Sequence, residues 1–213
     1  MQPDNPDPVS DLAAQVFAFL RVRAAELDLS RGAIDAIRPR GPVQPSALPV
    51  VGALADFADL ASPETEGVVR AIIAAARHMR WRQTYSREDG FPDDYFAHYG
   101  WFDLAGPNDG PYHAEGLRIY IGCWGQGFFY PDHSHPPEEH YIVLAGGAGF
   151  RLGQGPWRRL GPGDVFHTPP GAVHSADMRD GPLMAMAIWR HDDVSIRINL
   201  TDQDRDVVLP SDQ

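Results

Sequence analysis

From Trp81 onward, the chain consists of short apolar runs separated by turns that contain glycine and proline. Each run has the length of a strand and is rich in β-branched or aromatic residues, which favours β-structure. The runs are residues 117–124, 140–145, 149–152, 165–168, 173–178, 183–189 and 196–200. Many short strands at this spacing are typical of an antiparallel barrel or sandwich. The sequence therefore predicts a mainly β fold for this part of the chain.

The N-terminal part has apolar residues at helical spacing instead. Ser10 predicts the N-cap of a helix over about residues 11–28, and a further helical segment is expected over residues 48–60. The pair Ser62-Pro63, followed by acidic residues, predicts the start of a helix that continues to about Arg80. We therefore expect the N-terminal part to be helical throughout.

Length and composition indicate how these two parts are organised. The chain has 213 residues, of which 43% are hydrophobic, so it can bury one sizeable core. No flexible linker separates the helical part from the strand-rich part. We expect one structural unit, with an N-terminal helical region at residues 1–80 packed on a barrel at residues 81–213.

The net charge argues against two classes of partner, and the cysteine content excludes an intrachain disulfide. The formal net charge is -11, whereas nucleic acids and anionic membranes are bound by basic surfaces. The single cysteine, Cys123, excludes an intrachain disulfide and is expected to be a small buried side chain. The sequence shows no signal peptide and no apolar stretch of transmembrane length. A cytoplasmic protein that binds neither nucleic acid nor membrane is the expectation.

A cluster of histidines and a glutamate predicts a metal site. His133 and His135 are two residues apart, so on a strand their side chains point to the same face. Glu139 can return as a third ligand after the bend at Pro136-Pro137, and His174 follows a second block of glycine and proline. Such a nitrogen and oxygen set favours a divalent transition metal over calcium or magnesium. Zinc, iron, manganese, nickel and cobalt all remain candidates.

These two blocks resemble the paired signatures of the cupin superfamily. The first reads Gly-x5-His-x-His-x3-Glu-x6-Gly from Gly127 to Gly146, and the second reads Gly-x5-Pro-x-Gly-x2-His from Gly163. Met178 stands where the second pattern has asparagine, a departure outside the metal ligands. The resemblance implies a jelly-roll barrel with the metal in its mouth, onto which the helical region packs.

Two tyrosines flank the predicted ligands. Tyr141 follows Glu139 by two residues and therefore shares its face of the strand. A phenol beside a divalent cation has a lowered pKa, and the phenolate is a competent general base. Tyr130 lies three residues before His133 and is a second candidate for the pocket. The alternative for both tyrosines is a purely structural place in the barrel core.

A finer resemblance is to the cupin-type dimethylsulfoniopropionate (DMSP) lyases. The residues that carry it are Tyr-Pro-x-His-x-His-Pro-x-Glu-Glu-x-Tyr at 130–141, Trp-Arg-Gln-Thr-Tyr at 81–85 and Tyr-Gly-Trp-Phe-Asp-Leu-Ala-Gly-Pro at 99–107. It implies that His133, His135, Glu139 and His174 hold the metal. It also implies that Tyr141 acts as the base and that Tyr130 lines the substrate pocket. His140 departs from the residue usual at its position.

That family eliminates dimethyl sulfide from DMSP, a zwitterion with a carboxylate and a sulfonium, and leaves acrylate. Aromatic faces bind such cations, so Phe128, Tyr130, Trp124 and Trp189 are candidate substrate-binding residues. Strand alternation predicts that Phe128 and Tyr130 share a face and that Phe129 faces the opposite way. The resemblance also allows a homodimer, since cupins often form dimers.

Two other functions stay open on the same ligand set. One is a different metal-dependent cupin enzyme, a dioxygenase or an isomerase, acting on a small carboxylate. The other is a cupin that binds a small ligand without converting it.

Three further residues near the motifs are assigned away from the pocket. His140 and Glu138 alternate with Glu139, so they are expected to face outward. His167 lies inside the second block and is expected to be structural, with lining of the pocket as the alternative.

Overall fold

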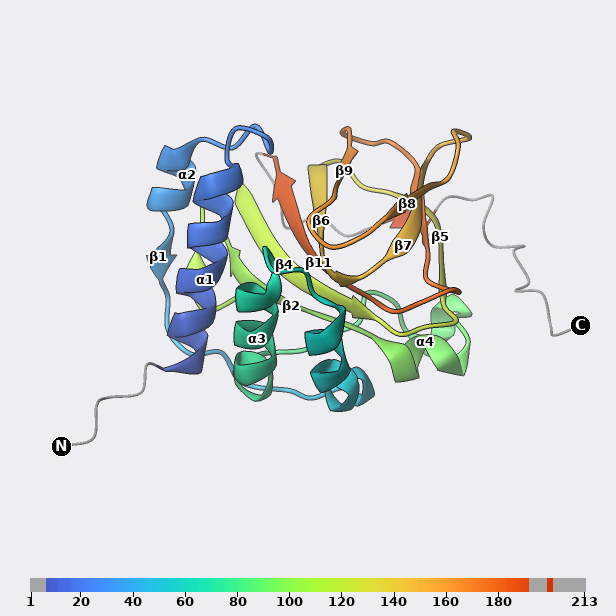
Figure 1. The fold of residues 1–213 in the computed structure, drawn as a ribbon, viewed down its shortest axis with the longest axis horizontal. Helices are drawn as coiled ribbons and strands as arrows, with labels where there is room; N and C mark the ends of the chain where they lie inside the picture. Colours follow the sequence, from blue (N-terminus) through green and yellow to red (C-terminus); the bar gives the residue numbers. More distant parts are fainter. Residues whose placement is uncertain (1–6, 192–198, 201–213) are drawn as a thin grey trace, which may run out of the picture.

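A computed structural model describes residues 7–191 and 199–200 of the chain. A layer of N-terminal helices covers one face of a large sheet, and a smaller sheet lies against the opposite face (Figure 1). Among the described residues, no helix is both long and apolar enough to span a membrane.

The helices occupy most of the N-terminal part and a short stretch before the first long strand. They are α1 (Pro8–Arg23), α2 (Arg31–Asp35), η1 (Pro49–Leu60), α3 (Glu66–Ala75), η2 (Ala76–His78), η3 (Arg87–Asp89) and α4 (Asp93–His98). Helix α1 begins earlier than predicted, because Asp7 rather than Ser10 is the N-cap and accepts a hydrogen bond from the Ser10 N–H. The segment predicted at residues 48–60 is a 3-10 helix.

Twelve strands in the described residues form two sheets. The seven-stranded sheet has the order β1-β3-β2-β4-β11-β6-β9, and the five-stranded sheet has the order β12-β5-β10-β7-β8. The strands are β1 (Arg38–Pro39), β2 (Tyr99–Gly106), β3 (Tyr112–His113), β4 (Leu117–Trp124), β5 (Phe129–Ser134), β6 (Glu138–Gly146), β7 (Ala148–Leu152), β8 (Arg158–Leu160), β9 (Val165–Thr168), β10 (His174–Asp177), β11 (Leu183–Arg190) and β12 (Asn199–Leu200). The predicted run at residues 196–200 lies partly outside the described residues.

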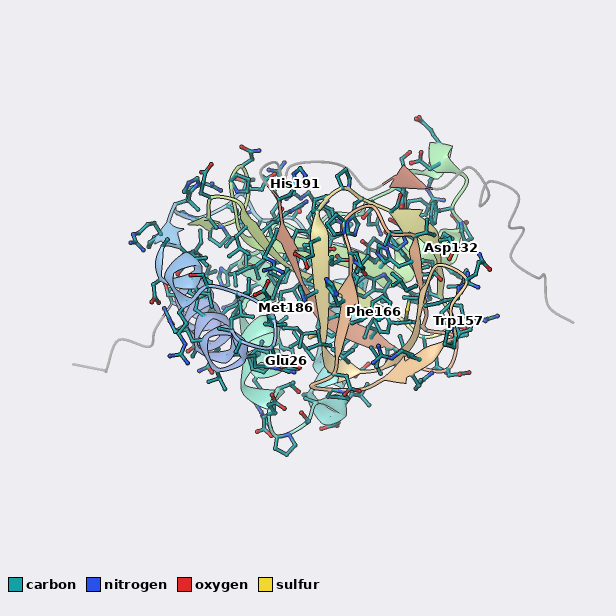
Figure 2. The ribbon with its side chains drawn as sticks, turned by 90° about the horizontal axis from the view of Figure 1, so that it is seen from above. Glu26, Asp132, Trp157, Phe166, Met186 and His191 are labelled. Atoms are coloured by element: carbon teal, nitrogen blue, oxygen red, sulfur yellow. The ribbon has the colours of Figure 1, made fainter. Side chains whose placement is uncertain are left out.

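The seven-stranded sheet is buried on both faces, which explains why its central strands are almost continuously apolar. Alternate residues of β4, β6 and β11 point to the helices on one side and into the barrel on the other. In Figure 2, Met186 lies on the side of the helices and Phe166 on the side of the barrel. One apolar core therefore fixes the helices to the sheet, and the other surrounds the site.

The structure confirms the predicted mainly β fold with helices packed on a barrel. One short element departs from the predicted helical region, because β1 pairs with β3 and so joins the seven-stranded sheet. The helices share their core with the outer face of this sheet. The boundary placed near residue 80 stays a prediction.

Candidate metal centre

The four predicted metal ligands meet inside the barrel. His133 lies on β5, His135 directly follows that strand, and Glu139 is the second residue of β6. His174 begins β10 and pairs with His133 across the small sheet. All four side chains are buried, so the site brings together groups that normally require a charged or hydrogen-bonding partner.

The three histidines share one orientation. The Nδ1 of each ring lies at hydrogen-bond distance from a backbone carbonyl oxygen two residues away, at 2.7 Å for His133, 2.8 Å for His135 and 3.1 Å for His174. A proton on Nδ1 satisfies these contacts and leaves the lone pair on Nε2. This is the arrangement by which proteins orient histidine ligands of metals.

The Nε2 atoms of His135 and His174 converge on one carboxylate oxygen. Glu139 Oε2 lies 3.1 Å from His135 Nε2 and 3.3 Å from His174 Nε2. The His133 ring lies 4.0 Å from that of His174, and within the described residues neither His133 Nε2 nor His174 Nε2 has a hydrogen-bond partner. Imidazole lone pairs that face a buried carboxylate oxygen repel it. A cation bound between the nitrogens and the oxygen removes this repulsion. His135, Glu139 and His174 therefore fit a metal site.

The electrostatics of the group are dominated by the pairing of imidazole with carboxylate. Burial alone would raise the pKa of Glu139, but the charge and hydrogen bond of His135, with His174 adding to their effect, hold it well below the ordinary value. Burial lowers the pKa of His133 strongly, and His174 adds to this effect. Burial also acts to lower the pKa of His135, yet the Glu139 carboxylate outweighs it and raises that pKa. Glu139 is thus ionised and His133 neutral.

The second oxygen of Glu139 is held by two aromatic donors. The Tyr120 hydroxyl and the Trp189 indole N–H each donate a 2.6 Å hydrogen bond to Oε1. The Trp189 ring also packs on His135, with centroids 4.5 Å apart. The structure therefore places Trp189 against two of the predicted ligands, while its predicted contact with substrate stays a prediction. Tyr120 was not predicted from the sequence, although it lies four residues before Trp124 and therefore shares the inner face of β4.

Aromatic side chains line the rest of the interior. The Tyr130 ring packs edge-on against His133, with centroids 4.6 Å apart. Trp124 and Phe128 are buried near Tyr130, with centroids 6.3 Å and 6.0 Å from it. Phe129 instead packs against Trp157 on the far side of the small sheet, which confirms the alternation predicted for residues 128–130.

Tyr141 is buried beside the ligands. Its ring centroid lies 6.5 Å from that of His174 and 6.1 Å from that of Trp124. Burial raises the pKa of Tyr141, the Glu139 charge raises it further, and a hydrogen bond with Tyr120 lowers it. A bound divalent cation acts in the opposite direction to burial and to the carboxylate charge.

Four more aromatic residues belong to this interior and were not predicted as pocket residues from the sequence: Tyr85, Phe91, Tyr95 and Tyr99. Tyr95 stands at their centre, and its hydroxyl accepts hydrogen bonds from the backbone N–H groups of Thr84 and Tyr85. The density of aromatic residues between positions 81 and 102 was a signal that could have found them.

Comparison with known proteins agrees with this geometry. The family model described as dimethylsulfoniopropionate lyase matches residues 23–185. Dimethylsulfoniopropionate lyase DddQ from Ruegeria pomeroyi is 36% identical over 159 residues, which are 74% of this chain and 77% of that protein. The crystal structure of DMSP lyase DddQ from R. pomeroyi has a TM-score of 0.82 at 31% identity, covering 91% of this chain and 96% of that chain.

A chain from the crystal structures of the DMSP lyases RdDddP and RnDddQII is similarly close. It has a TM-score of 0.81 at 28% identity and covers 91% of this chain and 97% of its own. The likeness therefore includes the N-terminal helices as well as the barrel. Since the family model also spans more than half of the sequence, the chain belongs to the dimethylsulfoniopropionate lyase family.

Proposed function

We infer that this protein cleaves DMSP to dimethyl sulfide and acrylate. Membership of the family supports the reaction, and one structural observation carries it. The His135 and His174 Nε2 atoms converge with the Glu139 carboxylate in an aromatic interior, with the His133 ring against that of His174 and the Tyr141 side chain beside them. A small zwitterion needs these parts, because its carboxylate requires a cation, its sulfonium requires aromatic faces and its acidic carbon requires a base.

His133, His135, Glu139 and His174 would hold one divalent transition metal ion: zinc, iron, manganese, nickel or cobalt. The donor set fits, because imidazole nitrogen and carboxylate oxygen together suit this class of ion. When bound, the ion supplies Lewis acidity toward the substrate carboxylate and so acidifies the neighbouring carbon–hydrogen bond.

Tyr141 is the proposed general base. Its phenolate takes the proton from the carbon next to the carboxylate, and the released electron pair forms the carbon–carbon double bond. The carbon–sulfur bond breaks with its electrons going to sulfur, which leaves as neutral dimethyl sulfide. The charges balance, since the proton ends on Tyr141 and acrylate keeps the carboxylate. Tyr120 supports this role indirectly, because its hydroxyl donates a hydrogen bond to Glu139, two residues before Tyr141, and so fixes the neighbouring carboxylate.

The aromatic residues hold the sulfonium end and exclude water. Tyr130, Phe128 and Trp124 are buried on the inner side of the barrel, where a cation over their faces is stabilised. Tyr130 also packs on His133, so it lies between the ligands and the aromatic cluster. This position suits a residue that contacts the sulfonium while the carboxylate points to the metal ligands.

Headspace gas chromatography with purified, metal-loaded protein and DMSP tests the inference, together with quantification of acrylate. We expect equal amounts of dimethyl sulfide and acrylate. Oxygen uptake that depends on ferrous iron would favour a dioxygenase instead. Saturable binding of DMSP without either product would favour a cupin that only binds its ligand.

A further inference from the structure

A second group of potential ligands lies on the opposite face of β6 from Glu139. Glu138 and His140 alternate with Glu139, so they point away from the barrel interior, as predicted. His167 lies on the neighbouring strand β9, directly paired with His140. Glu138, His140 and His167 each offer one ligand atom, and these atoms all lie within 4.8 Å of one another.

The backbone holds these three side chains together. Pairing of His140 with His167 stacks their imidazole rings, with centroids 4.5 Å apart and ring planes 21° apart. The His167 Nε2 lies 2.7 Å from Glu138 Oε1. The two imidazoles lie on paired strands, and the carboxylate lies two residues before His140 on the same face of β6. They need only small side-chain rotations to bind one ion, because the strands already fix the distances between them.

Charge and hydrogen bonding at the group also favour a cation. Arg190 donates a 2.6 Å hydrogen bond to Glu138 Oε2, which fixes the carboxylate and leaves Oε1 toward the histidines. The same guanidinium lies 3.4 Å from the Asp28 carboxylate, so two negative groups surround one positive group. His140 is buried, and its Nδ1 has no hydrogen-bond partner among the described residues. A buried imidazole nitrogen without a partner is costly unless a ligand completes it.

We propose that Glu138, His140 and His167 form a second binding site, for a divalent transition metal ion that favours imidazole, such as zinc or copper. Two nitrogens and one carboxylate oxygen are suitable ligands for these ions, with water completing the coordination. The site is open to solvent on one side, since 47% of the His167 side chain is exposed. It therefore exchanges its ion faster than the buried centre.

This site is independent of the barrel centre and of the proposed reaction. The two groups share β6 but lie on its opposite faces, with Glu139 between Glu138 and His140 in the sequence. Removing His167 therefore leaves all four ligands of the barrel centre in place. The His167 side chain is half-exposed and belongs to neither apolar core. His167→Ala therefore leaves both cores intact.

The test is metal stoichiometry on the full chain. Protein is stripped with a chelator, saturated with zinc, passed through a desalting column and analysed by mass spectrometry of the metal. We expect two zinc ions per chain for the wild type and for the control His78→Ala, and one for His167→Ala and His140→Ala. Circular dichroism checks that each variant is folded.

A spectroscopic measurement keeps the proposal testable if the second ion is lost on the column. Protein whose barrel centre has been filled with one equivalent of zinc is titrated with copper and examined by electron paramagnetic resonance. We expect a bound copper signal with nitrogen coupling in the wild type and in His78→Ala, and its loss in His167→Ala. A single ion by both methods, or a second ion that survives in His167→Ala, overturns the proposal whether or not DMSP is cleaved.

Discussion

The Tyr120 hydroxyl donates a 2.6 Å hydrogen bond to Glu139 Oε1, while the other oxygen of Glu139 faces the Nε2 atoms of His135 and His174. Together with the Trp189 indole, Tyr120 determines which oxygen is available to a metal ion. Partners of this kind orient metal ligands and contribute to metal affinity. Residues of β4 and β11 therefore hold Glu139 through the oxygen that faces away from His135 and His174.

The first prediction concerns this support of Glu139. Tyr120→Phe removes one of the two donors without changing the volume of the core, so Glu139 can rotate. Loss of such a partner typically costs about 10–100-fold in metal affinity. Competition with a chromophoric zinc chelator measures the change. Tyr112→Phe is the matched control, because Tyr112 lies on β3 and packs against Phe17, remote from the centre. Equal zinc affinity in the two variants would contradict a positioning role for Tyr120.

The second prediction separates the base from the metal ligands. Tyr141→Phe keeps the four ligands, so we expect wild-type metal content with turnover reduced by about 10²–10⁴-fold, the contribution of a positioned general base. Dimethyl sulfide release and metal analysis on one preparation measure both quantities. Tyr130→Phe keeps the ring that faces His133, so we expect a smaller loss. Full activity of Tyr141→Phe would exclude the phenol as base.

The third prediction is that chelation removes activity and stability together. Without an ion, Glu139 Oε2 faces the His135 and His174 Nε2 atoms directly, and His133 Nε2 has no hydrogen-bond partner among the described residues. An ion bound by the folded state alone contributes about 4 kcal/mol when present at a thousandfold excess over its Kd. Thermal unfolding with and without a chelator, followed by restoration with zinc or manganese, checks both effects. An unchanged melting temperature in a protein shown to be metal-free would contradict the prediction.

Three of the four proposed ligands could be named from the sequence because their spacing is local, whereas His174 was named from a second motif. His133, His135 and Glu139 lie within seven residues of one another, and strand alternation then places Tyr141 on the same face. The support of Glu139 was not predictable in this way. Tyr120 and Trp189 are 19 and 50 residues from Glu139 in the sequence, and only the pairing of β4, β11 and β6 brings them to it.

The apolar runs predicted from the sequence match continuously apolar strands, but they do not include β2 or β5. Strand β5 contains Pro131 and Asp132 and ends with the polar residues His133 and Ser134. It therefore lacks an apolar run. Strand β2 begins with Tyr99 and Gly100, and glycine weakens a strand signal. Both strands are fixed by their neighbours rather than by their own composition, which is why propensity alone did not find them.

The fourth prediction concerns the only cysteine in the sequence. Cys123 is fully buried on the helix-facing side of β4, and burial raises the pKa of its thiol. The thiolate is the reactive form, so the native protein should not react with a disulfide reagent at about pH 8. The same reagent should label one thiol per chain after unfolding in guanidinium, which serves as the control. Rapid labelling of the native protein would contradict the packing of the helices on the sheet.

The last prediction concerns a buried carboxylate behind the metal centre. Asp103 on β2 is 2% exposed and accepts a 2.6 Å hydrogen bond from Arg118 Nε and a further bond from Arg82. Arg118 in turn lies over the Trp189 ring, 5.2 Å from its centroid. This ion pair therefore connects strand β2 to the tryptophan that supports Glu139.

Asp103→Asn should destabilise the fold by about 3 kcal/mol, at the low end of the range for breaking a buried ion pair. The size is limited because asparagine still accepts one hydrogen bond and because 27% of the Arg82 side chain is exposed to solvent. The guanidinium groups of Arg82 and Arg118 nevertheless lose the negative charge that they share. Arg118 is then held less firmly over the Trp189 ring. Urea unfolding of this variant beside Asp56→Asn, an exposed aspartate, measures the difference. Equal stability of the two variants would show that the surrounding aromatic rings alone hold Arg118 in place.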